Sequence, residues 1–164
     1  MINIKNKYNL NGEFGVGYAS NTNKEFYFDL DDFYKIKDYR WAERPDGYLI
    51  SMTTGENIRM HRLIMNVKRD FVVDHINHNT LDNRKENLRI CNQHENSKNC
   101  IKHKNNTSGT SGVSLIKTSN RWRAYIYLNG KQINLGVYKN INDATKARKD
   151  AEIKYFGEYR CKLL

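Results

Sequence analysis

The chain is poor in proline and cysteine and lacks a long apolar run. It has one proline and three cysteines in 164 residues, and no apolar run approaches the length of a bilayer span. Because Cys91, Cys100 and Cys161 include no C-x-x-C pair, the sequence favours neither a disulfide framework nor a zinc knuckle. The first residues, "MINIKNKYNLNGE", lack the apolar segment of a secretory signal. We therefore expect reduced thiols, a cytoplasmic location and no membrane partner.

Acidic residues are also in deficit. The chain holds 18 Asp and Glu against 28 Lys and Arg, which gives a net charge of +10. The net charge rises along the chain, from −1 over residues 1–60 to +4 over 61–106 and +7 over 107–164. This gradient favours a polyanionic partner, and nucleic acid is the first candidate, although a well-solvated surface is the alternative. Asparagine is abundant, with 22 copies, so a single Asn that matches a motif is weak evidence.

Residues 1–60 are predicted to form a mostly β region that supports the rest of the chain. The runs "EFYFDL", "GYLISM" and "IRMHRLIM", which extends to residue 65, are typical of short strands. Between the first two, "DLDDFYKIKDYRW" predicts a short helix with Asp29 as its N-cap. We expect a small aromatic core made of Tyr27, Phe28, Phe33, Tyr34, Tyr39 and Trp41.

Residues 61–100 are predicted to form a second module, in the order strand, loop, strand and helix. The strands are "FVVDHI" and "NLRIC", and the polar run "NHNTLDNRKE" separates them. The following "NQHENSKNC" has no Gly or Pro, which allows a helix. Residues 101–112, "IKHKNNTSGTSG", show no periodicity and predict a linker.

Residues 113–164 are predicted to form a three-stranded antiparallel sheet packed on one helix. The strand-like runs are "GVSLIKT", "RWRAYIYL" and "KQINLGVY", and Asn129-Gly130 between the last two is a strong hairpin signal. The run "NINDATKARKDAEIKYFG" predicts a helix that Asn142 caps and Gly157 ends. The whole chain is therefore expected to belong to the α+β class.

An Asp-His pair marks the end of the first strand of the central module. Hydrolysis of a phosphodiester requires a base that activates water and a cation that neutralises the phosphate and the leaving oxygen. His75 is suited to be the base because an imidazole titrates near neutral pH, and Asp74 is a hard oxygen ligand suited to magnesium or manganese. Neighbouring strand residues point to opposite faces, so the strand must end or bend here for both to reach one phosphate.

The run "VDHINHNTLDNRKENLRICNQHENSKN" resembles the HNH, or ββα-metal, endonuclease motif in the form carried by homing endonucleases of phages and other mobile elements. The resemblance implies that His75 is the general base, that Asp74 and Asn96 bind one divalent cation, and that Asn87 holds the imidazole and the loop in place. His94 is the alternative to Asn96, because residues two apart on a helix diverge by about 200° and only one can face the cation.

Several other polar residues of this region have weaker assignments. His61 precedes the motif where the family often carries His-Arg-Leu, and we interpret it as structural or at most as a phosphate contact. His78 is expected to be an exposed loop residue. Three basic residues are candidate phosphate clamps, with solvated surface charge as the alternative: Arg84, Lys85 and Arg89.

The basic C-terminal segment has one polar and one apolar strand face. In "RWRAYIYL", alternation assigns Trp122, Ala124, Ile126 and Leu128 to the helix side. The segment resembles the Apetala-two/ethylene-response-factor DNA-binding domain, through "SGTSGV", "WRAYI", "GK", "LGVY" and "FGE". With the neighbouring basic residues, the expected DNA contacts are Ser114, Ile116, Lys117, Arg121, Arg123, Tyr125, Tyr127, Lys131, Gln132 and Asn134.

Taken together, these features predict a DNA endonuclease of homing or phage free-standing type, which in a phage would act in the host cytoplasm. Each active site would nick one strand of double-stranded DNA with magnesium or manganese and leave 5′-phosphate and 3′-hydroxyl ends. We expect no organic cofactor, and a monomer or a homodimer. The alternative functions are a non-catalytic DNA-binding regulator on a degenerate nuclease scaffold and an RNA-processing nuclease.

Overall fold

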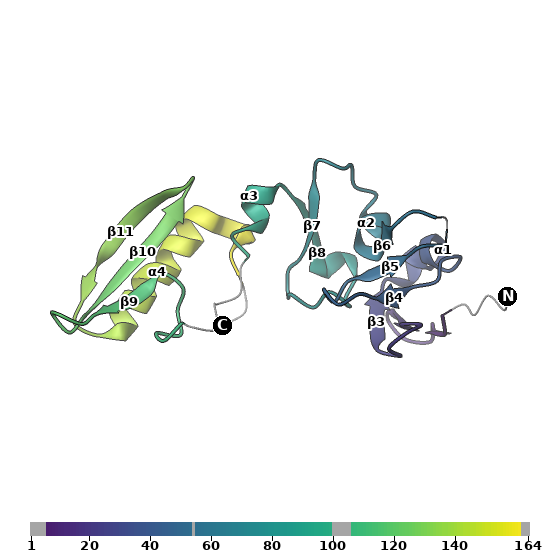
Figure 1. Cartoon of the computed structure of the whole chain (residues 1–164), viewed down its shortest axis with the longest axis horizontal. Coiled ribbons are helices and arrows are strands. Elements are labelled where there is room, and N and C mark those ends of the chain that lie inside the picture. Colours follow the sequence, from purple (N-terminus) through teal and green to yellow (C-terminus); the bar gives the residue numbers. More distant parts are fainter. Residues whose placement is uncertain (1–5, 54, 100–105, 162–164) are drawn as a thin grey trace. The chain divides into compact units, whose positions relative to one another are not determined.

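The computed structural model describes residues 6–53, 55–99 and 106–161, without the side chain of His94. The chain divides into two compact units, residues 1–96 and 97–164, which are described separately. Both combine antiparallel β-sheet with helices (Figure 1), which confirms the predicted α+β class. Within the described residues, no helix is long and apolar enough to cross a membrane.

The N-terminal unit begins with two small sheets around an aromatic core. The first sheet contains β1 (Tyr8–Asn9), β2 (Gly15–Tyr18) and β3 (Glu25–Phe28), and the second contains β4 (Ala42–Glu43), β5 (Leu49–Ser51) and β6 (Ile58–Arg59). A 3-10 helix (Leu30–Asp32) and α1 (Phe33–Ile36) connect them. A Cβ at Gly15 or Gly17 would collide with the Phe28 or Phe26 ring, so both glycines allow the rings to pack on β2. The core includes Phe26, Phe28, Ile36, Trp41 and Leu49.

Three local predictions for this unit differ from the structure in full or in part. The run "IRMHRLIM" forms only the two-residue β6 and then α2 (Met60–Met65), because Met60, His61 and Ile64 place buried side chains on one helical face. Asp29 occupies the predicted N-cap position, but its side chain makes no capping hydrogen bond, and its Oδ2 accepts from the Lys85 N–H at 2.8 Å instead. Tyr34, predicted in the core, is 66% exposed.

The central module has the predicted order of elements. Strand β7 (Val72–His75) pairs antiparallel with β8 (Leu88–Cys91), and α3 (Gln93–Asn96) follows. Helices α2 and α3 both pack against these two strands. Asn92 caps α3, because its Oδ1 accepts from the Glu95 N–H at 2.9 Å and the Glu95 Oε2 accepts from the Asn92 N–H at 2.8 Å. This reciprocal pair is a capping box, and it makes the short helix locally stable.

The C-terminal unit is a three-stranded sheet covered on one face by a helix (Figure 1). The strands are β9 (Val113–Ile116), β10 (Arg121–Leu128) and β11 (Lys131–Tyr138), and the helix is α4 (Ile141–Phe156). The hairpin prediction is confirmed: Asn129 has φ 50° and Gly130 has φ 77°, the positive values that a type I′ turn needs.

One detail of the C-terminal unit differs from the prediction. Asn140, not Asn142, caps α4, because the Asn140 Oδ1 accepts from the Asp143 N–H at 2.9 Å. Residues 106–112 of the predicted linker make hydrogen bonds within this unit: the Ser108 Oγ donates to the Val113 carbonyl at 2.7 Å, and the Gly112 carbonyl accepts from Tyr125 at 2.8 Å. Residues 101–105 of that linker lie outside the described residues.

Candidate active site and nucleic-acid-binding face

His75 lies in a buried ring cluster between β7 and α2. Its side chain is 3% exposed, and its ring centroid lies 5.1 Å from that of His61 and 5.7 Å from that of Tyr48. The His75 Nε2 is 3.5 Å from the Asn83 Oδ1. Burial lowers the pKa of His75 below its usual value, although Asn83 and the nearby carboxylates oppose this shift. His75 is therefore neutral at neutral pH and can accept a proton.

The His61 imidazole is also buried and neutral. Burial, followed by the charges of His75, Arg59 and Arg62, lowers the pKa of His61 to about 3. Its Nδ1 has no hydrogen-bond partner among the described residues. Two adjacent imidazoles can share this space because neither is charged near pH 7. His61 therefore contributes shape and packing to the base rather than a competing positive charge.

Asp74 is turned to the opposite side of the β7–β8 pair. Alternation along β7 separates it from His75, and it lies across from Arg89 in the strand register. The Asp74 Oδ2 accepts from the Arg89 Nε at 2.9 Å and from Nη2 at 2.6 Å, with both side chains about one-tenth exposed. The strand ends after His75, whose carbonyl accepts from the His78 N–H at 3.0 Å. The predicted end of the strand is therefore present directly after the Asp-His pair.

Asn87 and Asp82 organise the loop between β7 and β8. The buried Asn87 accepts at Oδ1 from the Asn77 N–H at 2.9 Å and donates from Nδ2 to the Asp82 carbonyl at 2.8 Å. The Asp82 carboxylate binds the Arg84 guanidinium at 2.8 Å and 2.9 Å. Burial alone raises the pKa of Asp82, but the hydrogen bonds and charge of Arg84 outweigh it and hold the pKa below its usual value. Asn87 therefore fixes the loop, whereas the side-chain amide beside the His75 imidazole is that of Asn83.

The first sheet anchors the same loop from a distant part of the sequence. The Tyr27 N–H donates to the Leu81 carbonyl at 2.9 Å, and the Tyr27 carbonyl accepts from the Asn83 N–H at 2.8 Å. The Thr80 Oγ1 donates to the Gly47 carbonyl at 2.8 Å. The N-terminal region therefore positions the loop that carries Asn83 to the candidate base.

The three candidate phosphate clamps of the nuclease module are all paired with carboxylates. Arg84 binds Asp82 and stacks over the Phe14 ring, Lys85 lies 2.7 Å from the buried Asp32, and Arg89 binds Asp74. The hydrogen bond with Asp32 raises the pKa of Lys85, and the bond with Asp82 raises the pKa of Arg84. Their charges are thus compensated inside the protein, and their role as phosphate contacts stays a prediction.

Asn96, the candidate second metal ligand, is the last residue of α3 and is partly buried. The side chain of His94 is outside the described structure, so the choice between the two residues stays a prediction. No group of three or more His, Cys, Asp or Glu residues in the described ranges is arranged to hold a metal ion. The two candidate ligands, Asp74 and Asn96, offer a carboxylate and a carboxamide, both oxygen donors that suit magnesium or manganese more than zinc.

Residues that sequence reasoning did not assign to the base lie closest to it. Tyr48 belongs to the loop before β5, His61 to α2, and Asn83 to the loop after β7. The His-Arg-Leu run was the only sequence signal for His61, and Asn83 was hidden by the abundance of asparagine. Tyr48 had no local signal, because its contact with His75 depends on the packing of separate elements.

The exposed face of the C-terminal sheet gathers most of the expected DNA contacts. The register places Tyr125 opposite Asn134 and Tyr127 opposite Gln132, and the Tyr127 hydroxyl donates to the Gln132 Oε1 at 2.9 Å. Lys131 pairs with Leu128 and so belongs to the other side of the hairpin, whereas Lys117 follows the end of β9. The remaining expected residues share the outer face through cross-strand pairing: Ser114, Ile116, Arg121 and Arg123.

Comparison with known proteins agrees with this architecture. Residues 60–98 match the family described as HNH endonuclease. A protein of Acanthamoeba polyphaga mimivirus, described as an uncharacterized HNH endonuclease L560, is 32% identical over 110 residues, which cover 63% of this chain and 56% of that relative. The match thus spans about half of the relative's length, and no solved structure matches the chain. The family match and the β7–loop–β8–α3 order at the same residues identify residues 60–98 as an HNH endonuclease domain.

Proposed function

We propose that this protein is a metal-dependent DNA endonuclease of homing or phage free-standing type, which nicks one strand at each active site. The observation that carries the proposal is the neutral, enclosed His75 at the end of β7 within an HNH endonuclease domain. The net positive charge of the chain, +10, supports a polyanionic substrate.

In the proposed reaction, His75 accepts a proton from the attacking water. The water oxygen bonds to phosphorus, and the bond from phosphorus to the 3′ oxygen breaks. The leaving oxygen keeps the electron pair and takes a proton from solvent, so the products are 5′-phosphate and 3′-hydroxyl ends. Asn83 orients the imidazole through Nε2, and the Tyr48 and His61 rings restrict its rotation. Tyr48 and His61 are thus positioning residues.

Asp74 and Asn96 fit a divalent cation by the chemistry of their donor atoms. Both offer hard oxygen ligands, and magnesium is commonly held by one or two protein oxygens with water and phosphate as the other ligands. A cation bound there neutralises charge on the scissile phosphate and on the leaving oxygen. Arg89 fixes the direction of the Asp74 carboxylate through two hydrogen bonds to Oδ2. Because Arg89 binds the Asp74 Oδ2, a cation at this site would share the Asp74 carboxylate with the Arg89 guanidinium.

DNA recognition is assigned to the outer face of the β9–β11 sheet. Its aromatic and amide side chains are exposed or partly exposed, and residues 107–164 carry a net charge of +7. A sheet face of this kind can enter the major groove and contact base edges. Deletion of residues 107–164 should relax the choice of site and leave slow, metal-dependent nicking. Unchanged targeting would refute the assignment.

One observation favours the alternative of a non-catalytic DNA-binding protein. The Asp74 Oδ2 is engaged by Arg89, and His75 is only 3% exposed, so the two residues would also suit a structural role. Nicking of supercoiled plasmid with magnesium, manganese or EDTA distinguishes the two functions. The nuclease proposal requires metal-dependent nicking that His75→Ala strongly slows, with only residual nicking left. Binding without nicking, or equal nicking by His75→Ala, would support the alternative or another mechanism.

A further inference from the structure

We propose that a pocket beside α2 binds a phosphate of the DNA backbone that flanks the scissile phosphate, through Arg59 and Arg62. The inference rests on the proposed nuclease function. It adds a substrate-binding site that neither the sequence motifs nor the family match indicated.

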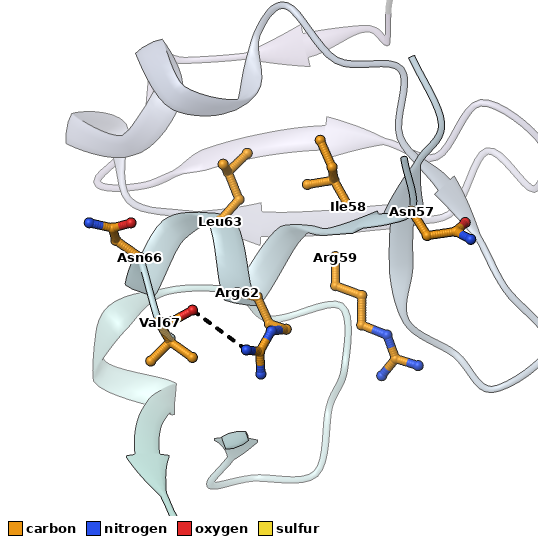
Figure 2. Close-up of a pocket in the computed structure, with 7 residues that line it drawn as sticks. All are labelled: Asn57, Ile58, Arg59, Arg62, Leu63, Asn66 and Val67. Atoms are coloured by element: carbon orange, nitrogen blue, oxygen red, sulfur yellow. Dashed lines mark hydrogen bonds between the residues drawn. The ribbon is translucent and has the colours of Figure 1, made fainter. Parts of the chain in front are cut away.

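The pocket combines cationic, amide and apolar side chains. It has a volume of about 370 Å³ and is lined in part by Asn57, Arg59, Arg62, Asn66 and Val67. Figure 2 shows that the Arg59 side chain, at the end of β6, and the Arg62 side chain, from α2, extend toward the same side. No acidic residue lines the pocket. Guanidinium and carboxamide N–H groups are donors to phosphate oxygens, whereas the apolar wall suits the carbon atoms of deoxyribose.

The Arg62 guanidinium is held rigidly without an acidic partner among the described residues. It donates to the carbonyl oxygens of Phe71 at 2.7 Å, Lys68 at 2.9 Å and Val67 at 3.5 Å. Carbonyl groups fix its position but do not cancel its charge. Arg62 therefore presents an oriented, uncompensated cation to the pocket.

Arg59 is also only weakly compensated. Its Nη2 is 3.5 Å from the Asp46 Oδ2, and its side chain is 39% exposed. Asp46 also lies 3.9 Å from Arg44, so one carboxylate is divided between two cations. By contrast, Arg84, Lys85 and Arg89 contact their carboxylates at 2.8 Å or less. Arg59 and Arg62 are thus less closely paired with carboxylates than Arg84, Lys85 and Arg89 are.

The pocket is connected to the candidate base through one aromatic ring. The Arg59 guanidinium lies 4.9 Å from the centroid of the Tyr48 ring, which is 5.7 Å from the His75 ring. Phosphates of one strand follow each other with a rise of about 3.4 Å along the duplex axis. When the scissile phosphate lies at His75, a neighbouring phosphate can therefore reach Arg59 on the other side of the Tyr48 ring. Residues 59–69 contain four Lys or Arg and no acidic residue, and Asp70 follows before β7 begins. A continuous strand backbone, rather than an isolated anion, fits this arrangement.

The test measures binding of a duplex containing the mapped nick site to the full chain with His75→Ala. Adding Arg59→Gln should weaken binding about tenfold and reduce the slope of log K against log salt by about one, the change for one lost phosphate contact. Arg40→Gln removes an exposed arginine of the same unit and should leave both quantities unchanged. Arg62→Lys, which keeps the charge but not the fork of donors, should have an intermediate effect.

Phosphate-ethylation interference locates the contact. Arg59→Gln should abolish interference at a phosphate within a few positions of the nick and leave the remaining pattern intact. An unchanged salt slope and interference pattern, or an equal loss with Arg40→Gln, would refute the pocket assignment. Displacement of the duplex by millimolar inorganic phosphate would show a small-anion site instead. Failure of the His75→Ala chain to bind any duplex would refute the proposed function itself.

Discussion

Replacing Asn87 with alanine should destabilise the N-terminal unit and the candidate active site together. The side chain is buried and makes two hydrogen bonds, to the Asn77 N–H and the Asp82 carbonyl. Alanine leaves the buried carbonyl without a donor, at about 1–3 kcal/mol, and removes the partly buried Asn77 bond, at about 1 kcal/mol. The expected loss in the free energy of unfolding is therefore about 2–4 kcal/mol. Nicking should fall as well, because the same loop carries Asn83 to His75.

The two tryptophans allow this change to be measured in one unit at a time. Trp41 is fully buried in the N-terminal unit, and Trp122 belongs to β10, so urea unfolding in a Trp122→Phe background follows Trp41 alone. Asn79→Ala is the matched control in the same loop, since its bond to the Leu81 N–H is exposed and should contribute about 0.5 kcal/mol or less. A loss below about 0.5 kcal/mol for Asn87→Ala, or a loss equal to the control, would refute the reasoning.

Three other predictions follow from particular contacts. Because the pKa of His61 is lowered to about 3, the unfolded chain takes up a proton here at a higher pH than the folded chain does. The contribution of His61 to the free energy of unfolding is therefore complete above about pH 6.5, and it declines by about 1.4 kcal/mol per pH unit from there toward pH 3. His61→Phe should flatten this decline in urea titrations, and an unchanged pH dependence would contradict the assignment. His61→Leu should slow nicking in the wild-type chain but not the residual nicking of His75→Ala; an equal effect in both backgrounds would indicate general destabilisation. Asn140→Ala should cost about 1 kcal/mol of C-terminal-unit stability, whereas Asn142→Ala should cost little, and the reverse order in urea unfolding would contradict the observed cap.

Local patterns predicted the elements whose signals are contained in a few neighbouring residues. The Asn129-Gly130 turn, the alternation of β10 and the order of strands around Asp74-His75 were all readable from the sequence and are present in the structure. The short run that became β6 and α2 was misassigned, because an apolar segment of that length fits either a strand or one helical turn. The length of the run, not its composition, made the prediction fail.

Most contacts of the candidate site could not be predicted because they join distant residues. Asp32 pairs with Lys85, and Tyr48 meets His75, only after separate elements have packed. The same limit affected the phosphate clamps: their sequence positions suggested free cations, but the fold supplies a carboxylate for each. The prediction of the α4 cap failed for a different reason. Asn140 and Asn142 both lie at the start of the helix, and only the backbone geometry selects Asn140.

The backbone hydrogen bonds that join Tyr27 with Leu81 and with Asn83 have a consequence for folding during synthesis. They join segments more than fifty residues apart, so the entropy of closing that chain segment must be overcome before the loop is fixed. On the ribosome, β3 is made well before its partner loop, and its edge stays unpaired in the interval. The candidate catalytic loop is therefore expected to be among the last parts of the N-terminal unit to become ordered, and under the proposed function nicking requires that pairing.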